Sequence, residues 1–309
     1  MSLRWRLTLS LLKALPQGLL SRGFGRVADL PVPAFLRGPL FRSFVRITGA
    51  DPEEAARPIH AYGSLNDFFV RRLREGVRSW PRDPAQPASP VDGIVGASGE
   101  LDGLTALQAK GRQYSVAELL DDAAEARRFE GGTYVTLYLS PRHYHRIHAP
   151  VSGTIPKACH LPGRLLPVND AAVHGVSELF PRNERLTCYV DSGAGRVAVV
   201  AVGAFNVGRI SSAFDPSWNR GRGAGASVSN RGVIRRREVR RYDPPLSVDR
   251  GGEIMAFHLG STVVLLFEPG RVELDPGWTV GREVRLGELL GRVRARHTGP
   301  ARESRSDRR

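Results

Sequence analysis

The sequence predicts an α+β protein in which a β-rich, barrel- or sandwich-like catalytic core follows amphipathic N-terminal helices. From about residue 88, short runs rich in Val, Ile, Leu, Thr and Tyr alternate with Gly and Pro, a pattern typical of closely spaced strands. Before that point, apolar residues lie in short segments between prolines, as expected of short helices. The chain has 309 residues, of which 41% are hydrophobic and 25% charged, as in ordinary globular proteins.

Residues 1–58 are expected to form short helices. Asp51 is predicted to begin one of them, because it can act as an N-cap and Pro52 suits the first helical position. The prolines expected to separate these helices are Pro31, Pro33 and Pro39.

The first 24 residues, MSLRWRLTLSLLKALPQGLLSRGF, combine leucines with Arg4, Arg6 and Lys13. These charges and the lack of a small-x-small cleavage site argue against a signal peptide. Residues 3–11 alternate as in a strand, whereas the later leucines continue a helix-like face. Two interpretations stay open: a basic amphipathic segment on a membrane surface, or a helix packed on its own domain.

Two further helices and four strands are predicted within the core. A helix over 64–72 begins with Ser64 as the cap, and one over 115–129 begins with Ser115 and with Glu118 in the capping-box position. The runs expected to be strands are 133–139, 186–190, 197–202 and 263–267.

The charge balance is strongly basic: 45 Lys+Arg stand against 31 Asp+Glu, for a net charge of +14. Such a chain suits nucleic acid, an anionic membrane or an anionic substrate, and composition alone does not choose among them. The Arg- and Gly-rich segment 214–250 is interpreted either as a basic loop beside the site or facing lipid, or as a solvated loop. Cys159 and Cys188 have no CxxC partners and are expected to be small core residues in a reducing compartment.

The stretch YLSPRHYHRIH, residues 138–148, holds three histidines within six positions: His143, His145 and His148. No Cys or carboxylate stands beside them at ligand spacing, so the pattern is weak support for a metal site. Histidine is the side chain best suited to proton transfer near neutral pH. The stretch is therefore predicted to be catalytic.

Asp92 and Ser261 complete the set of candidate catalytic residues. A turn aspartate such as Asp92 more often binds its own backbone, but with His148 and Ser261 it would form a triad. A serine hydrolase that uses Asp92, His148 and Ser261 without self-cleavage is therefore one alternative. Its nucleophile would normally lie in Gly-x-Ser-x-Gly at a strand-to-helix turn, whereas Ser261 begins a strand and no second glycine follows.

Seven stretches between residues 60 and 270, taken in order, resemble the bacterial membrane-associated phosphatidylserine decarboxylases. The stretches are SLNDFFVRRL, SPVDGIV, LQAKGRQYSVAELL, YLSPRHYHRIHAPVSGTI, LFPRNERLTCYV, VGAFNVGRI and HLGSTVVLLFEPG. The resemblance implies a proenzyme that cuts itself between Gly260 and Ser261 into a long chain, 1–260, and a short chain, 261–309. Ser261 would become an N-terminal pyruvoyl group, the covalent cofactor, with neither a metal nor pyridoxal phosphate.

The resemblance also implies a role for each remaining candidate. His148 would be the base for self-cleavage, Asp92 its orienting partner, and His145 the residue that returns a proton after decarboxylation. His143 stands where the family is expected to have aspartate, which affects the local charge.

Phosphatidylserine is the implied substrate, with phosphatidylethanolamine and CO2 as products in phospholipid biosynthesis. The family further implies a homodimer and a peripheral location at the cytoplasmic side of the cell membrane, on an anionic surface. The expected organisation is a membrane-associating segment 1–58, a catalytic domain 59–296 and a disordered tail 297–309. A nucleic-acid-binding module is disfavoured, because residues 219–241 hold no aromatic side chain between the basic ones.

Overall fold

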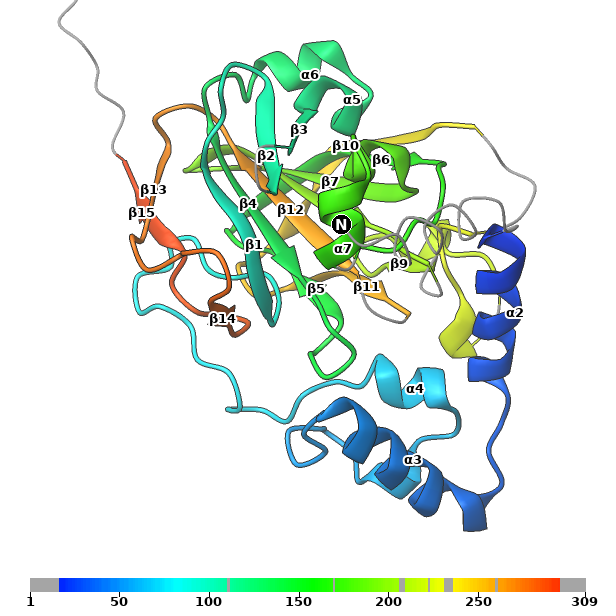
Figure 1. Ribbon diagram of the computed structural model, residues 1–309. Helices are drawn as coiled ribbons and strands as arrows, with labels where there is room; N and C mark the ends of the chain where they lie inside the picture. Colours follow the sequence, from blue (N-terminus) through cyan, green and yellow to red (C-terminus); the bar gives the residue numbers. More distant parts are fainter. Residues whose placement is uncertain are drawn as a thin grey trace, which may run out of the picture.

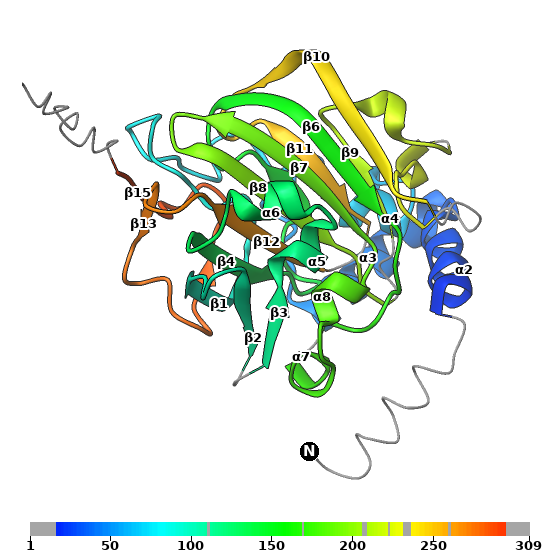
Figure 2. The same cartoon turned by 90° about the horizontal axis from the view of Figure 1, so that it is seen from above.

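The computed structural model describes residues 17–109, 112–168, 170–205, 209–221, 223–230, 236–258 and 261–294. The architecture is the predicted α+β fold. One large antiparallel sheet forms its centre, a small sheet and several short helices cover its faces, and the N-terminal helices gather on one side (Figure 1). Viewed from above, the large sheet is strongly curved and β10 forms one of its edges (Figure 2).

The large sheet has eight antiparallel strands, and the smaller sheets have three, two and two. In spatial order the large sheet contains β10 (Glu238–Val248), β6 (Gly153–Leu161), β7 (Arg185–Ser192), β8 (Gly195–Val202), β12 (Thr262–Phe267), β4 (Thr133–Tyr138), β1 (Gly93–Glu100) and β14 (Glu283–Val284). The smaller sheets contain β5 (Arg146–His148), β11 (Glu253–Phe257) and β9 (Ile210–Ser212); β13 (Val272–Leu274) and β15 (Gly291–Val293); and β2 (Thr105–Ala109) and β3 (Arg112–Ser115). All four predicted strands are confirmed, as β4, β7, β8 and β12.

Strand β12 lies in the middle of the large sheet and is buried on both faces. Val263, Leu265 and Phe267 enter the core beneath the β5-β11-β9 sheet. Val264 and Leu266 enter a second core, beneath the short helices. The double burial explains why the run has no polar alternation, and it anchors the chain that begins at Ser261.

The helices over the second core are α5 (Val116–Leu120), α6 (Ala123–Arg127), α7 (Asp170–Gly175) and α8 (Leu179–Arg182). The predicted cap is confirmed, since the Ser115 hydroxyl accepts a hydrogen bond from the Glu118 amide at 3.3 Å. The single helix predicted over 115–129 is wrong, because two helices form there. Asp121 takes a left-handed conformation with φ of 49°, and Asp122 then caps the second helix.

The N-terminal region contains α2 (Gln17–Asp29), α3 (Ala34–Thr48), the 3-10 turn η1 (Ile59–Ala61) and α4 (Leu65–Phe69). The predicted break at Pro39 is wrong, because α3 continues through it; a proline removes one backbone hydrogen bond, and the rest of this helix persists. The predicted helix at Asp51 is also wrong. The Asp51 carboxylate accepts from the Glu53 amide at 2.8 Å and closes a turn.

The predicted cap of α4 is confirmed, because the Ser64 hydroxyl accepts from the Asp67 amide at 3.1 Å. The helix nevertheless ends at Phe69 rather than at residue 72. Both cysteines are buried and free, as predicted. The first part of the predicted amphipathic segment, 1–16, and the tail 297–309 fall outside the described residues.

Helices α2 and α3 expose many large apolar side chains, with Phe35 78% and Ile47 83% accessible. The others on these helices and the adjoining turn are Leu19, Leu20, Phe24, Val27, Leu30, Leu36 and Leu40. Among the described residues, no helix is both long and apolar enough to cross a membrane.

Candidate active site

Asp92 and Ser261 lie at the same end of the large sheet, on either side of β4. Ile94 on β1, Tyr138 on β4 and Thr262 on β12 lie in register across adjacent strands. Since β4 is antiparallel to both neighbours, β1 and β12 begin at the end of the sheet where β4 finishes. Asp92 and Ser261 immediately precede these two strands, and the Leu139 amide donates to the Ser261 carbonyl at 2.7 Å.

The histidine-rich stretch lies at the same end of the sheet, where backbone hydrogen bonds join it to the segment before Asp92. The His148 amide donates to the Pro90 carbonyl at 2.9 Å, and the Ala88 amide donates to the Pro150 carbonyl at 3.0 Å. Strand β11, which comes shortly before Ser261 in the chain, pairs with β5 of this stretch. Next to the paired residues, the Phe257 amide donates a hydrogen bond to the His145 carbonyl at 2.9 Å.

The hydroxyl of Ser261 is fully buried and has no hydrogen-bond partner among the described residues. Its chain neighbours Leu259 and Gly260 fall outside that part of the chain. Buried hydroxyl groups are ordinarily hydrogen-bonded, and leaving one unsatisfied is destabilising by about 1–3 kcal/mol. An unpaired nucleophilic oxygen at the start of a rigid strand is therefore a candidate reactive group.

His148 is held in one tautomer. Its Nδ1 lies 2.6 Å from the Gly251 carbonyl, which can only accept, so Nδ1 carries the proton. Nε2 is then the acceptor for the Tyr144 hydroxyl at 3.1 Å. Burial lowers the pKa of His148, while the hydrogen bond to Gly251 opposes that shift. The imidazole is therefore neutral near pH 7 and has a lone pair on Nε2, as a general base requires.

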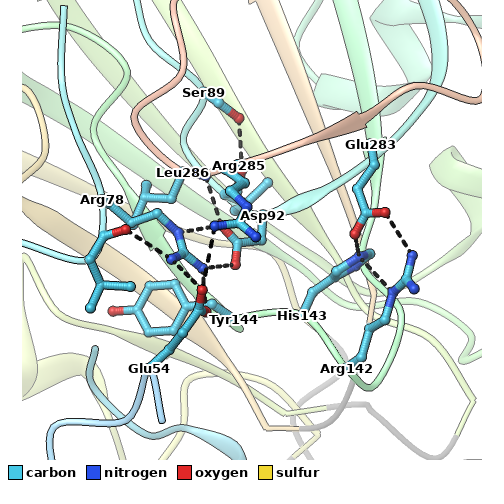
Figure 3. A network of polar contacts seen from close by, with 12 residues as sticks. Glu54, Arg78, Ser89, Asp92, Arg142, His143, Tyr144, Glu283, Arg285 and Leu286 are labelled. Atoms are coloured by element: carbon cyan, nitrogen blue, oxygen red, sulfur yellow. Dashed lines mark hydrogen bonds and ion pairs between the residues drawn. The ribbon is translucent and has the colours of Figure 1, made fainter. Parts of the chain in front are cut away.

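Asp92 is tightly held. Its carboxylate accepts from Arg78 Nε at 3.0 Å and Nη2 at 2.5 Å, and from the Leu286 amide at 2.7 Å. Arg78 also donates to both oxygens of Glu54, at 2.9 and 2.7 Å. The guanidinium thus lies between two carboxylates (Figure 3).

Asp92 and His148 are near each other but do not form a hydrogen bond in the described part of the chain. The charge of Asp92 still raises the pKa of His148 against the larger effect of burial. Sequence reasoning missed Arg78 and Glu54, which lie in a turn-rich stretch with no recognisable pattern. It also missed Tyr144, although its position between His143 and His145 was a usable signal.

His145 is fully buried, and neither ring nitrogen has a hydrogen-bond partner among the described residues. Its ring packs on Phe69 of α4, with centroids 4.1 Å apart. Burial lowers the pKa of His145 well below its usual value, and the charge of Arg71 lowers it further. The ring is neutral in this state, so one nitrogen carries a hydrogen and the other has a lone pair that can take up a proton and return it.

His143 belongs to a separate group of contacts (Figure 3). Its Nδ1 accepts from the Ser140 amide at 3.0 Å, and Nε2 lies 3.4 Å from Glu283. Burial and the charge of Arg142 lower the pKa of His143. The side chain thus closes the turn after β4.

The comparisons with known proteins identify the family to which the chain belongs. A family model described as phosphatidylserine decarboxylase matches residues 65–292. A phosphatidylserine decarboxylase proenzyme of Anaeromyxobacter sp. (strain K) is 43% identical over 286 residues, covering 93% of this chain and 98% of the relative. A proenzyme of the same name from Myxococcus xanthus is 41% identical, covering 92% and 97%. A third, from Methylococcus capsulatus, is 38% identical, covering 95% and 99%.

Proposed function

Because the chain belongs to the phosphatidylserine decarboxylase family, we propose that it cuts itself between Gly260 and Ser261 and decarboxylates phosphatidylserine with the resulting pyruvoyl group. Phosphatidylethanolamine and CO2 are the products. The observation that carries this proposal is the buried hydroxyl of Ser261, which has no hydrogen-bond partner among the described residues and lies at the end of the sheet where Asp92 also lies. Residues 59–296 form the catalytic domain in this proposal.

Self-cleavage begins when Ser261 Oγ attacks the Gly260 carbonyl carbon and the Ser261 nitrogen leaves, which converts the amide into an ester. His148 Nε2 is the proposed base for the hydroxyl proton, and its Nδ1–H is fixed by Gly251. Loss of the Ser261 Cα proton then breaks the Cβ–O bond. Gly260 leaves as the carboxylate that ends the long chain 1–260.

Water then hydrolyses the enamine left at Ser261, and ammonia is released. The short chain 261–309 thereby begins with a ketone carbonyl. This pyruvoyl group supplies an electron sink for the carbon that loses CO2, the work that a cofactor does in other decarboxylases.

The residues present fit such a group. Ser261 is fully buried, away from water, and β12 fixes it through both cores. Asp92, held by Arg78, supplies a negative charge close to the neutral His148. His145 is the proposed donor of the proton that replaces CO2, because its neutral ring can take up a proton from the substrate amine and return it. Without a hydrogen-bond partner among the described residues, the ring lies beside the segment leading to Ser261.

The serine hydrolase with an Asp92–His148–Ser261 triad is not favoured. The family model and the relatives are phosphatidylserine decarboxylases, and the relatives are named as proenzymes. Ser261 also immediately precedes a strand, whereas a hydrolase nucleophile normally lies in Gly-x-Ser-x-Gly at a strand-to-helix turn.

The deciding experiment is the intact mass of the purified protein beside a Ser261→Ala variant. Wild type is expected to give a chain of residues 1–260 and a blocked chain of residues 261–309, and Ser261→Ala a single uncut chain. An uncut wild type that still released CO2 from phosphatidylserine would contradict the pyruvoyl mechanism.

Residues 1–58 are proposed to lie on an anionic membrane surface, at the cytoplasmic side of the cell membrane, with the enzyme as a homodimer. The exposed apolar side chains of α2 and α3, interspersed with arginines, support the membrane contact. Replacing Phe35 and Ile47 together by aspartate should reduce cosedimentation with phosphatidylglycerol vesicles, whereas Val280→Asp, at an exposed position of the β-rich part, should not. Equal binding of all three proteins would exclude α3 as the contact.

A further inference from the structure

Arg71, just after α4, is a buried cation without a carboxylate partner in the described structure. The residue is 2% exposed, and its Nε and Nη1 have no hydrogen-bond partner among the described residues. Among the described residues, Nη2 makes one long hydrogen bond, 3.4 Å to the Arg142 carbonyl, and the guanidinium carbon lies 5.3 Å from the centre of the Phe68 ring. Burial lowers the pKa of Arg71, yet a guanidinium remains charged in proteins. Buried charges are normally paired, so this one lacks an anion.

The missing anion would lie in the active site. Phe69, two residues before Arg71, packs on the ring of His145. The charge of Arg71 lowers the pKa of His145, and the charge of Asp92 opposes the effect of burial on Arg71. Asp92 itself is already bound by Arg78. In the described structure, three buried groups at this site lack full hydrogen bonding: the Arg71 guanidinium, the His145 ring and the Ser261 hydroxyl. Segment 139–145 links them, because the Leu139 amide donates to the Ser261 carbonyl and the Arg142 carbonyl lies 3.4 Å from Arg71.

We propose that Arg71 binds the phosphodiester of the lipid head group, an inference that rests on the proposed function. A guanidinium matches the geometry of phosphate oxygens and forms strong charge-assisted hydrogen bonds with them. The substrate carboxylate is the poorer choice. It loses its charge as CO2 leaves, so a cation held on it would stabilise the bound substrate more than the transition state.

The phosphodiester keeps its charge throughout the reaction. Binding it positions the amino acid head group without opposing the loss of CO2. Arg71 is thus a specificity residue for anionic phospholipid, distinct from the residues assigned to self-cleavage and proton return.

The neighbouring Arg72 provides a matched control. It is 72% exposed and lies 3.6 Å from Glu253. The first measurement is the fraction of self-cleaved chain on a denaturing gel, for wild type and for the variants Arg71→Gln, Arg71→Lys and Arg72→Gln. Kinetics use short-chain phosphatidylserine as substrate and short-chain phosphatidylethanolamine, which has the phosphate but no carboxylate, as inhibitor.

Arg71→Gln should cut normally and raise KM for phosphatidylserine by about 10- to 100-fold, as expected for a lost charged hydrogen bond. Its Ki for phosphatidylethanolamine should rise by a similar factor, while kcat changes less. Arg71→Lys should lie between wild type and Arg71→Gln, and Arg72→Gln should match wild type.

An unchanged KM would overturn the proposal. A raised KM with an unchanged Ki for phosphatidylethanolamine would overturn it too, since it assigns the contact to the carboxylate. Failure of both Arg71 variants to cut would make the residue structural and equally contradict it. A wild type that neither cuts nor decarboxylates would instead refute the proposed function; Arg71 is then tested by phosphatidylethanolamine binding to wild type and Arg71→Gln, where equal affinities overturn the proposal.

Discussion

Two groups of buried or partly buried polar residues lie near the same end of the large sheet. They differ in how many of their hydrogen-bonding atoms have partners. In the paired cluster, Glu54, Arg78 and Asp92, one guanidinium bonds both carboxylates. The open cluster, Arg71, His145 and Ser261, contains nitrogens and an oxygen without partners in the described structure. The paired cluster fixes the position of Asp92, and the proposed reaction and substrate contact use the groups of the open cluster.

The largest expected effect is on catalysis by the open cluster. His145→Ala should still cut, but decarboxylation should fall by about 10²- to 10⁴-fold, the usual contribution of a general acid. The measurement is CO2 release per mole of cut enzyme, with the unfolding free energy as a check on folding. An uncut His145→Ala protein would show that the roles of His145 and His148 are assigned wrongly.

The next effect is on the stability of the paired cluster. Arg78→Ala leaves Asp92 without its cation and Glu54, among the described residues, with only the exposed Arg285, 3.6 Å away. Breaking such a buried pair is destabilising by about 3–5 kcal/mol. Urea unfolding measures this loss. Arg142→Ala is the control, because its pair with Glu283 is exposed and should contribute about 0–1 kcal/mol. Similar losses for both variants would contradict the distinction between the two kinds of pair.

The smallest effect is a pH dependence of stability that comes from His145. Burial lowers the folded-state pKa of His145 well below 6.5, so the unfolded state binds more protons below that pH. Stability is therefore lost as the pH falls from 6.5 towards the folded pKa, by about 2 kcal/mol between pH 6.5 and 5. His145→Gln should remove this part of the slope in urea unfolding at the two pH values. An unchanged slope would show that His145 is not held neutral by burial.

Local sequence predicted those parts of the molecule that local interactions decide. The apolar runs of β8 and β12 and the caps at Ser64 and Ser115 depend on neighbouring residues, and they are as predicted. The predictions at Pro39 and Asp51 were wrong. Pro39 was expected to end a helix, but α3 continues through it. Asp51 was expected to begin a helix, but its carboxylate bonds the Glu53 amide and closes a turn instead.

The sequence by itself determined the family and the candidate residues, because short continuous motifs contain them. The candidates are Asp92, His145, His148 and Ser261. Only the tertiary structure decided which of the many arginines are buried. Arg78 and Arg71 look like any of the others along the chain. Arg78 joins Glu54 to Asp92. Arg71 lies close to His145, with no carboxylate partner in the part of the chain that the structure describes. Burial and pairing arise from contacts between distant segments, which local patterns do not record.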